Sequence, residues 1–363
     1  MSSRVHGSIL IALLGVIGAA HAAEPANSSS VAWPRANNAV PHDAQIETRI
    51  VDILHKLTLE QKVAQMVQPD IRSVTAADVK QYRIGSVLNG GGAWPGEKKS
   101  STIGDWVALA DQYYDASMDT SGGAPAIPII WGTDAVHGHN NVIGATLFPH
   151  NSALGATHDP ELIERIGAAT AQEVAVTGID WVFAPTVAVV RDDRWGRTYE
   201  GYSEDPELVR TYAARMVRGL QGAAGTPAFL NAQHVTATAK HYIGDGGTNL
   251  GIDHGDNCAT EDELLKIHAQ GYLGALESGV QTVMASYNSW QGTKVHGHHY
   301  LLTISFKSDT TGQLIFWRIS PVNVYPKANL VLPPPCFKRT AAFRQTDPAM
   351  GRNSRPVNRF VVI

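Results

Sequence analysis

Polar side chains that could bind a small ligand follow short apolar runs at four places in this sequence. The four stretches are Asp134 to Asn141, Arg191 to Glu200, Lys240 to Thr248 and Tyr287 to Trp290. Carboxylate, guanidinium and ammonium groups form charge-assisted hydrogen bonds with hydroxyl groups, and an aromatic ring offers a flat face to an apolar surface. This mixture of groups is typical of a sugar site rather than of a phosphate site.

Helix-like and strand-like segments alternate along most of the chain and must position these residues. Amphipathic patterns predict helices at Ile46–Leu57, Leu59–Met66, Asp105–Met118, Pro160–Thr177, Pro206–Leu220 and Glu261–Glu277. Runs rich in β-branched residues predict strands near Val67 and at Ile84–Leu88, Ile127–Trp131, Ile179–Val190, Val235–Ala239 and Val280–Ala285. The alternation indicates a parallel sheet with crossover helices, either an open doubly wound sheet or a closed barrel.

Four of the predicted helices begin with a recognisable start signal. Thr58 and Thr260 each precede a Gln or Glu by three residues, which is the pattern of a capping box. Asp159 and Asp205 each stand directly before proline, so each offers an acidic cap to a helix that starts with proline.

The position of the polar residues favours the barrel over the open sheet. Functional groups of parallel α/β proteins gather at the carboxyl ends of the strands, because the loops there vary without disturbing the core. A charged residue at one strand end is most often only the point where the chain meets water. Because four ends carry such groups, we predict an α/β fold of the (β/α)8 TIM-like barrel class. About six βα units are recognisable, so we expect an incomplete barrel without a second α/β domain.

Two other kinds of site have less support. His137 and His139, with Lys240 and His241, resemble the ligand set of metal-dependent amide hydrolases built on a barrel. The histidine pair, however, follows an interior strand, and Asp134 precedes it at the strand tip. We therefore predict no metal and no cofactor. We found no glycine-rich phosphate loop and no basic stripe before residue 304, so a nucleic acid is not an expected partner.

Composition separates the last 60 residues from the rest. The chain has 363 residues, 44% of them hydrophobic and 17% charged, which excludes wholesale disorder and a coiled coil. The net charge of the whole chain is −4. Residues 1–303 have 20 basic and 31 acidic residues and a net charge of −11, whereas residues 304–363 have nine basic and two acidic residues and a net charge of +7. Seven of the 19 prolines but two of the 34 glycines also lie after residue 303.

The N-terminus has the pattern of an export signal. Arg4 precedes an apolar run from Ser8 to Ala20, and Ala20-His-Ala22 is an A-x-A cleavage pattern. We predict cleavage after Ala22 and a periplasmic or secreted protein that is not membrane-bound after cleavage. Cys258 and Cys336 are too few for a disulfide framework, and a single bridge between them is left open.

Several motifs closely resemble the N-terminal barrel of family 3 glycoside hydrolases, and within it the exo-acting β-glucosidase and β-glucan glucohydrolase branch. They are Asp134-Ala-Val-His-Gly-His-Asn-Asn, Phe148-Pro-His-Asn, Arg191 to Glu200 with Tyr202-Ser-Glu-Asp, Ala239-Lys-His-x-x-Gly-Asp-Gly-Gly-Thr248 and Met284-x-Ser-Tyr-x-Ser-Trp. The resemblance covers residues 43–303 and implies that the residues matching Asp134, Arg197, Lys240, His241 and Tyr287 line a glucose-binding subsite. The implied partner is a β-glucoside or β-glucan oligosaccharide. The hexosaminidase branch carries a Lys-His-Phe-Pro-Gly-type segment, which differs from Lys240-His-Tyr-Ile-Gly here.

The chain departs from this family where catalysis would be expected. The resemblance implies a retaining mechanism with two carboxyl groups about 5–5.5 Å apart. Relatives carry the nucleophile in a Ser-Asp-Trp-type strand end and the general acid in a second domain, and we identify neither here. Asp309 and Asp347 are the only aspartates after residue 303, and neither follows a predicted buried strand.

These observations give the predicted domain organisation: signal peptide 1–22, linker 23–42, incomplete barrel 43–303 and a basic, proline-rich tail 304–363. The tail is explained by a frameshift near residue 303 or, alternatively, by a genuine basic segment that binds a partner. A barrel without its last strands has unpaired edges, so we expect poor folding and negligible hydrolysis by this chain. A non-catalytic sugar-binding remnant is the alternative to an enzyme.

Overall fold

The computed structural model of the protein describes residues 33–34, 39–40, 43–303, 315–317 and 361–362. The predicted signal peptide, most of the linker and most of the basic tail lie outside the described residues, as do Cys336, Asp309 and Asp347. The chain divides into two units, Met1–Ala32 and Trp33–Ile363, and all described residues belong to the second.

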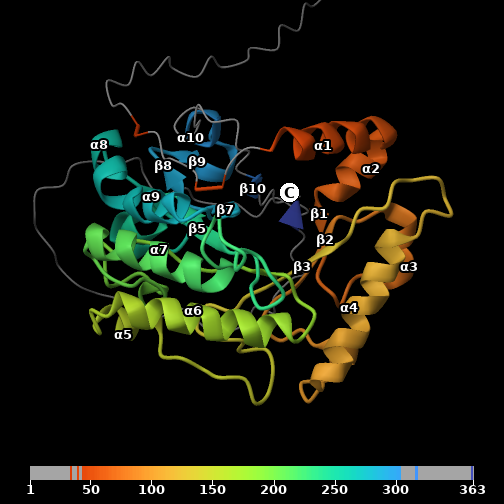
Figure 1. Cartoon of the computed structure of the whole chain (residues 1–363). Helices are drawn as coiled ribbons and strands as arrows, with labels where there is room; N and C mark the ends of the chain where they lie inside the picture. The colour runs from red at the N-terminus through yellow and green to blue at the C-terminus, as the bar shows by residue number, and fades with distance from the viewer. Residues whose placement is uncertain (1–32, 35–38, 41–42, 304–314, 318–360, 363) are drawn as a thin grey trace, which may run out of the picture. The chain divides into compact units, whose positions relative to one another are not determined.

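Parallel strands in chain order form the centre of this unit (Figure 1). They are β1 (Val67–Gln68), β2 (Ser86–Asn89), β3 (Ile130–Thr133), β4 (Trp181–Val182), β5 (Thr238–Tyr242), β7 (Thr282–Ala285) and β10 (Ile315–Trp317). One sheet has the order β2-β3-β4 and another the order β10-β7-β5, and all of these pairings are parallel. Parallel neighbours in chain order are the arrangement of a (β/α) barrel, and the predicted α/β class is confirmed.

Isolated backbone bridges connect these two sheets and the segment after β1. Trp181 bridges Thr236 and Thr186 bridges Lys240, so the chain from β4 onward runs parallel to the chain that leads into β5. Asp70, just after β1, bridges Leu88 of β2. The number of βα units and the closure of the barrel stay predictions.

Three short strands form a separate sheet beyond β5 and β7. They are β6 (Asp256–Asn257), β8 (Ser289–Trp290) and β9 (Thr293–Lys294), in the order β6-β8-β9. A further strand, β11 (Val361–Val362), pairs antiparallel with β1. Two segments from the predicted tail, β10 and β11, therefore pair with β7 and β1, whereas we had expected unpaired strand edges there.

The helices follow the predicted pattern closely. They are α1 (Ala44–Lys56), α2 (Leu59–Gln65), α3 (Ala76–Tyr82), α4 (Ile103–Met118), α5 (Asn151–Gly155), α6 (Pro160–Ala175), α7 (Pro206–Gln221), α8 (Glu261–Glu263), α9 (Gln270–Glu277) and α10 (His299–Thr303). A five-residue π-helix, Leu264–His268, continues the chain from α8 towards α9. The short helices α3, α5 and α10 were not predicted.

The four predicted helix starts are confirmed. Thr58 and Thr260 form complete capping boxes, in which the threonine side chain and the residue three positions later exchange hydrogen bonds. Asp159 accepts from the backbone N–H of Leu162, and Asp205 accepts from that of Glu207. These bonds satisfy backbone donors that have no partner inside the helix.

The length predicted for the longest strand, Ile179–Val190, is wrong. Only Trp181 and Val182 form β4, and Pro185 interrupts the segment three residues later. Proline has no backbone N–H and cannot donate a hydrogen bond to a neighbouring strand. The segment therefore cannot form a continuous ladder of hydrogen bonds with both of its neighbouring strands. Beyond it the backbone of Val187 still donates to the carbonyl of Lys240 at 2.8 Å.

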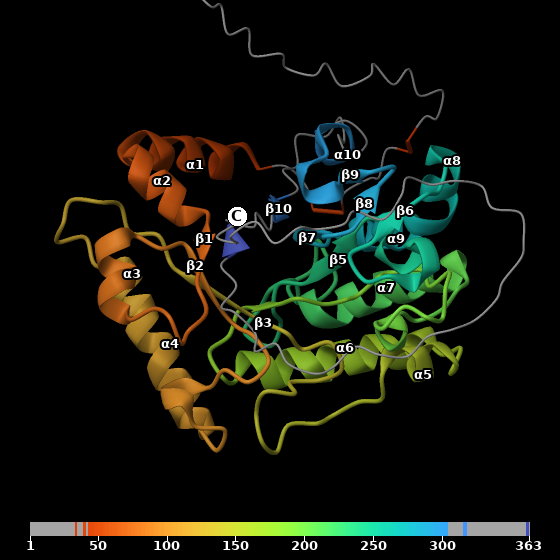
Figure 2. The same ribbon diagram turned by 180° about the vertical axis from the view of Figure 1, so that it is seen from behind.

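Helices α6, α7 and α9 pack side by side against the strands (Figure 2). Gly167 of α6 faces Gly219 of α7, and a Cβ atom on Gly219 would collide with the carbonyl of Glu164. The two backbones can approach this closely only because neither residue has a side chain.

We expect Gly219→Ala to lower the free energy of unfolding by about 1–3 kcal/mol, because the added methyl group has no room between α6 and α7. Gly122→Ala is the matched control, since a Cβ atom there meets no atom within 4 Å. Urea denaturation of both variants measures the difference. Equal midpoints for the two variants would contradict the close packing.

Apolar side chains inside the strand layer form a small cluster beneath the strand ends. Trp181, Phe183 and Met284 are buried together, and Tyr287 packs against them. The Trp181 indole N–H donates to Thr238 Oγ1 at 2.7 Å, which connects β4 to β5. This cluster supports the residues that follow the strands.

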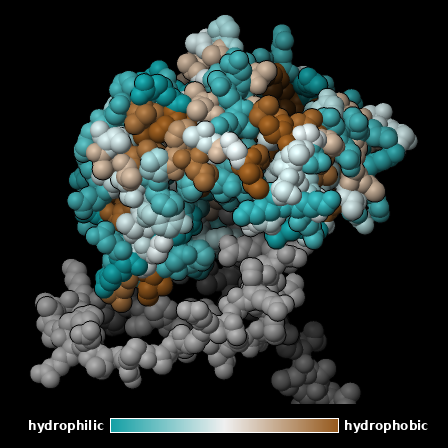
Figure 3. All heavy atoms as spheres, turned by 90° about the horizontal axis from the view of Figure 1, so that it is seen from below, coloured by the Kyte–Doolittle hydropathy of each residue, from teal (hydrophilic) through white to brown (hydrophobic). Residues whose placement is uncertain are grey.

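Helices α1 and α2 contribute no buried residue, although both carry apolar side chains. The exposed apolar residues on or just after them include Ile46, Val51, Leu54, Leu59, Val63 and Met66. Figure 3 shows another face of the molecule, on which hydrophobic residues gather in patches between polar ones. Among the described helices, none combines the length and the hydropathy needed to cross a bilayer.

Candidate functional site

Asp134 and Lys240 form an ion pair across the strand layer. Asp134 follows β3 directly, Lys240 lies in β5, and Lys240 Nζ donates to Asp134 Oδ1 at 2.9 Å. The lysine side chain is 4% exposed and the aspartate side chain 44% exposed. Burial raises the pKa of Asp134, but the charge of Lys240 and its hydrogen bond outweigh burial and lower the pKa overall. The carboxylate is therefore ionised and open to a ligand on one side.

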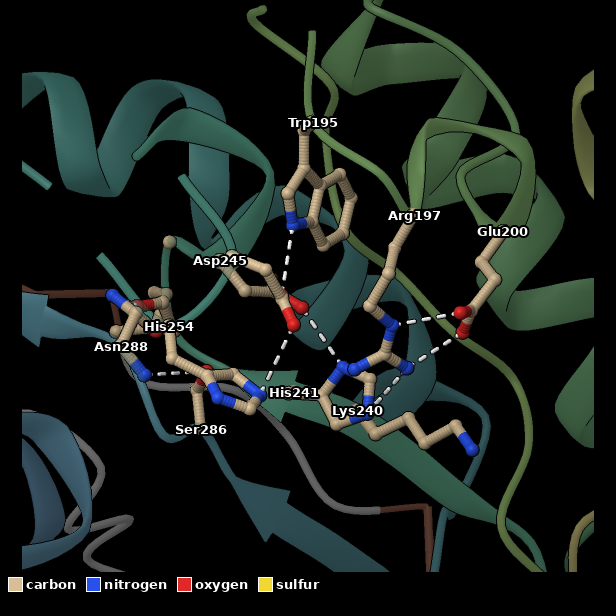
Figure 4. A network of polar contacts seen from close by, with 12 residues as sticks. Trp195, Arg197, Glu200, Lys240, His241, Asp245, His254, Ser286 and Asn288 are labelled. Atoms are coloured by element: carbon tan, nitrogen blue, oxygen red, sulfur yellow. Dashed lines mark hydrogen bonds and ion pairs between the residues drawn. The ribbon is translucent and has the colours of Figure 1, made fainter. Parts of the chain in front are cut away.

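Arg197 is held in a fixed orientation by Glu200. Its Nε and Nη2 atoms each donate to one carboxylate oxygen of Glu200 at 2.7 Å, which is the bidentate geometry of a guanidinium and a carboxylate (Figure 4). Burial lowers the pKa of Arg197, but Glu200 outweighs burial and raises it overall. Arg197 is therefore a permanent cation in this site.

His241 contacts Arg197 on one side of its ring and Asp245 on the other. Nη2 of Arg197 lies 3.1 Å from Nε2 of His241, and Oδ2 of Asp245 lies 2.8 Å from Nδ1. Burial, followed by the charges of Arg197 and Lys240, keeps the pKa of His241 well below its usual range. The imidazole is therefore neutral at neutral pH. Burial also raises the pKa of Asp245 to about 6.

Tyr287 lies two residues after β7, beside the end of β5. The backbone N–H of Ser286 donates to the carbonyl of Tyr242 at 2.5 Å, which joins the two strand ends. The Tyr287 ring packs against His254 and His296, with ring centroids 5.3 and 5.5 Å apart. The structure thus joins Asp134 to Lys240 and Arg197 to His241 by hydrogen bonds, and it places Tyr287 at the neighbouring strand end.

Two acidic residues of this network were not selected from the sequence as site residues. Glu200 lies three residues after Arg197, and Asp245 lies four residues after His241. Both occur within motifs already noted, and their spacing from a basic residue was the available signal. Glu200 binds Arg197 three residues before it, and Asp245, just after β5, binds His241 of that strand, so local geometry brings each pair together.

The loop after β3 is fixed by hydrogen bonds around Asn141. Its amide donates to Thr133 Oγ1 and to the carbonyl of Asp134, both at 3.1 Å. The indole N–H of Trp94 donates to the carbonyl of Asn141 at 3.1 Å. These bonds hold the backbone on both sides of the Asp134 carboxylate.

The two histidines of the predicted metal alternative have different surroundings. His139 is buried, contacts Thr177 Oγ1 at 3.1 Å and packs against Trp106. His137 packs instead against His150, with ring centroids 4.8 Å apart. Within the described part of the chain, no three His, Cys, Asp or Glu side chains are grouped so as to hold a metal ion.

The site presents charged donors and an acceptor of fixed orientation within one small region. Asp134 offers a carboxylate that is partly open, Lys240 an ammonium group and Arg197 a guanidinium on a side chain that is 28% exposed. Such a set can bind several hydroxyl groups of one ligand at once. The fold and this site define a parallel α/β domain with a cluster of charged side chains at the carboxyl ends of its strands.

The chain belongs to glycosyl hydrolase family 3. The model for the "Glycosyl hydrolase family 3 N terminal domain" matches residues 58–311, which is more than half of the chain. The match extends eight residues past the barrel boundary expected from the sequence, residue 303.

Relatives and solved structures are similar over the same region. A lysosomal beta glucosidase of Dictyostelium discoideum is 30% identical over 71% of this chain and 33% of its own length. A periplasmic beta-glucosidase of Salmonella typhimurium is 26% identical over 70% of this chain and 30% of its own length. The crystal structure of an exo-1,3/1,4-beta-glucanase from a Pseudoalteromonas species is 52% identical, with a TM-score of 0.75, over 79% of this chain and 36% of that one. The chain thus spans about a third of the length of the curated relatives that it matches.

Proposed function

We propose that this chain carries the glucose-binding subsite of an exo-acting family 3 β-glucosidase. The observation that carries the proposal is the paired network of Asp134 with Lys240 and Arg197 with His241 at neighbouring strand ends. The β-glucosidase relatives and the exo-glucanase structure support glucose as the sugar. The substrate class of the complete enzyme would be a β-glucoside or β-glucan.

The chemistry of the network fits a single sugar ring. The Asp134 carboxylate can accept hydrogen bonds from two adjacent hydroxyl groups, and charged acceptors bind hydroxyls about twice as strongly as neutral ones do. Arg197 and Lys240 can donate to the remaining hydroxyl oxygens. Tyr287 can cover an apolar face of the ring.

We further propose that residues 1–363 bind the sugar without hydrolysing it. A retaining glycosidase needs one free carboxylate as the nucleophile and a second carboxyl group as the acid. Within the described network the carboxylates of Asp134, Glu200 and Asp245 are each bonded to Lys240, Arg197 or His241. The strand next to β7, β10, is followed in the sequence by Arg318 rather than by an aspartate.

A titration of the purified chain with glucose, followed by NMR, tests the binding proposal. We expect saturable binding by the parent chain and none by Asp134→Ala. Folding of both proteins is checked by circular dichroism. Folded parent protein that does not bind glucose would overturn the proposal.

Incubation with an aryl β-glucoside tests the second proposal. We expect release of the aryl group at the rate of the buffer blank, because no free pair of carboxyl groups is provided by the described network. Asp134→Ala is the control for contaminating glycosidase. Turnover by the parent chain that is lost in this variant would show that a nucleophile is present after all.

We also propose export to the periplasm or the medium. The N-terminal pattern of Arg4, the apolar run and Ala20-His-Ala22 motivates this, and periplasmic relatives support it. N-terminal sequencing of protein secreted by a bacterial host is expected to begin at Ala23. A mature protein that still begins at Met1 would contradict the proposal.

A further inference from the structure

The ring of Tyr287 contacts two imidazole rings that come from different loops. His254 lies between β5 and β6, and His296 lies in the 3-10 turn Val295–Gly297 that follows β9. The ring centroids of His254 and His296 are 5.3 and 5.5 Å from that of Tyr287, with interplanar angles of 57° and 75°. The orientation of the Tyr287 ring therefore depends on where these two loops hold their imidazoles.

One ammonium group joins the loop of His254 to that of Tyr287. Nζ of Lys294, in β9, donates to the backbone carbonyl of His254 at 2.9 Å and to that of Tyr287 at 2.8 Å. An ammonium group has three donors, so a single lysine can bind both carbonyls at once. Burial lowers the pKa of Lys294 overall, although the charge of Asp256 acts in the opposite direction. The ammonium group is thus partly withdrawn from water between the two loops.

The strand that carries Lys294 is held independently of this ammonium group. β9 pairs antiparallel with β8, and the hairpin turn Gln291–Gly292 has positive φ angles of 49° and 85°, as the tight turns of hairpins require. The N–H of Gly292 donates to Asp256 Oδ1 at 2.8 Å, which joins the turn to β6. Lys294 therefore extends from a fixed hairpin, and the loss of its ammonium group is expected to leave the hairpin in place.

The backbone of His254 needs the bond from Lys294 more than its neighbours do. His254 has a φ of 58°, a conformation that a non-glycine residue adopts only at a cost in free energy. The next residue, Gly255, has a separate connection, because its carbonyl accepts from the N–H of Ser289 at 2.9 Å. Removing the ammonium group of Lys294 is thus expected to release His254 while the rest of its loop stays attached to β8.

We propose that Lys294 is a positioning residue of the sugar site, which acts on the bound sugar through Tyr287. By binding the carbonyls of His254 and Tyr287, it keeps their two rings in contact, and this contact restricts the Tyr287 ring to one orientation. The direct roles of Asp134 and His241 in binding the sugar are unaffected. The proposal rests on the proposed glucose site, of which Tyr287 is a part.

The first test reads the ring contact in the chain without ligand. NMR of protein with labelled tyrosine and histidine rings detects nuclear Overhauser effects between Tyr287 and His254, and their loss in His254→Asn assigns them. We expect these effects in the parent chain and in Lys294→Arg, which keeps a cationic donor. In Lys294→Met, which keeps only an apolar stem, we expect them to be lost.

The second test measures the dissociation constant for glucose. Lys294→Met is expected to weaken the affinity at least about threefold, because the Tyr287 ring must then be ordered on binding, and Lys294→Arg is expected to restore most of it. His254→Asn is expected to cause a similar loss, because asparagine tolerates a positive φ but has no ring to pack on Tyr287. The double variant is expected to lose less than about twofold beyond either single variant, because both residues act through the same ring.

Lys266→Met is the matched control. Lys266 is also an exposed lysine with a bonded ammonium group, but its Nζ pairs with Asp262, four residues earlier, at 2.7 Å. We expect the contact between Tyr287 and His254, and the affinity for glucose, to be unchanged in this variant.

Each result of these tests decides for or against the positioning role. Ring contacts that persist in Lys294→Met, an unchanged affinity of that variant, or losses that add in the double variant would overturn it. If Lys294→Met does not fold, His254→Asn decides, since binding at the parent affinity would show that this contact does not orient Tyr287. If the folded parent chain fails to bind glucose, the proposed function fails, while the ligand-free spectra still decide whether Lys294 holds the two rings together.

Discussion

Acidification from pH 7 to pH 4 is expected to destabilise the folded chain by about 3 kcal/mol, because neutral histidines are buried in it. His139 and His268 are buried, and burial lowers the pKa of each to about 4. In the unfolded chain both titrate near 6.5. Between pH 6.5 and 4 the unfolded chain therefore binds protons that the folded chain does not, so the free energy of unfolding falls as the pH falls.

The protonation of Asp245 changes the free energy of unfolding in the opposite direction and offsets part of this loss. Its pKa is raised to about 6 in the folded chain, against an ordinary value of 3.8, so the folded chain binds its proton first. On acidification each histidine lowers the free energy of unfolding by up to about 3 kcal/mol, and Asp245 raises it by a similar amount. The sum is the net loss of about 3 kcal/mol given above. The lowered pKa of His241 adds to the loss in the same direction.

Thermal unfolding followed by circular dichroism between about pH 7.5 and pH 4 measures this dependence. His139→Gln is expected to flatten it, because the glutamine amide can replace the contact of Nε2 with Thr177 without titrating. His55→Gln, in the exposed α1, is the control and should leave the pH dependence unchanged. A melting temperature that rises on acidification would contradict the prediction.

Asp134→Ala is expected to destabilise the chain by about 3 kcal/mol, in addition to its effect on glucose binding. The variant leaves the Lys240 ammonium group, which is 4% exposed, without its carboxylate. Breaking a buried pair from one side costs about 3–5 kcal/mol, and the open side of Asp134 allows water to moderate the loss.

The reverse variant, Lys240→Met, is expected to lower the free energy of unfolding by less than half as much as Asp134→Ala does. Methionine keeps the apolar stem of the lysine in place, and the remaining Asp134 carboxylate, 44% exposed, can be hydrated. Urea denaturation at neutral pH gives both differences. Equal losses for the two variants would contradict this difference, and a larger loss for Lys240→Met would show that Asp134 is the more deeply desolvated partner.

Local sequence signals predicted the helices well. Thr58, Asp159, Asp205 and Thr260 cap helices where expected, because their side chains bond to backbone groups two or three residues away. The strands were predicted less accurately in length. Pro185 removes one backbone donor from the longest run, and beyond Val182 an isolated bridge between Thr186 and Lys240 takes the place of a continuous strand, since strand pairing depends on donors facing a distant neighbour.

The sequence by itself determined the family, the α/β class and the selection of polar residues at the strand ends. These properties depend on residue type, period and short-range spacing, which a chain shows without being folded. The tertiary structure decided which of those residues bond to each other. Asp134 and Lys240 are 106 positions apart, and Arg197 and His241 are 44 apart. Only the parallel order of β3, β4 and β5 brings these groups within hydrogen-bond distance.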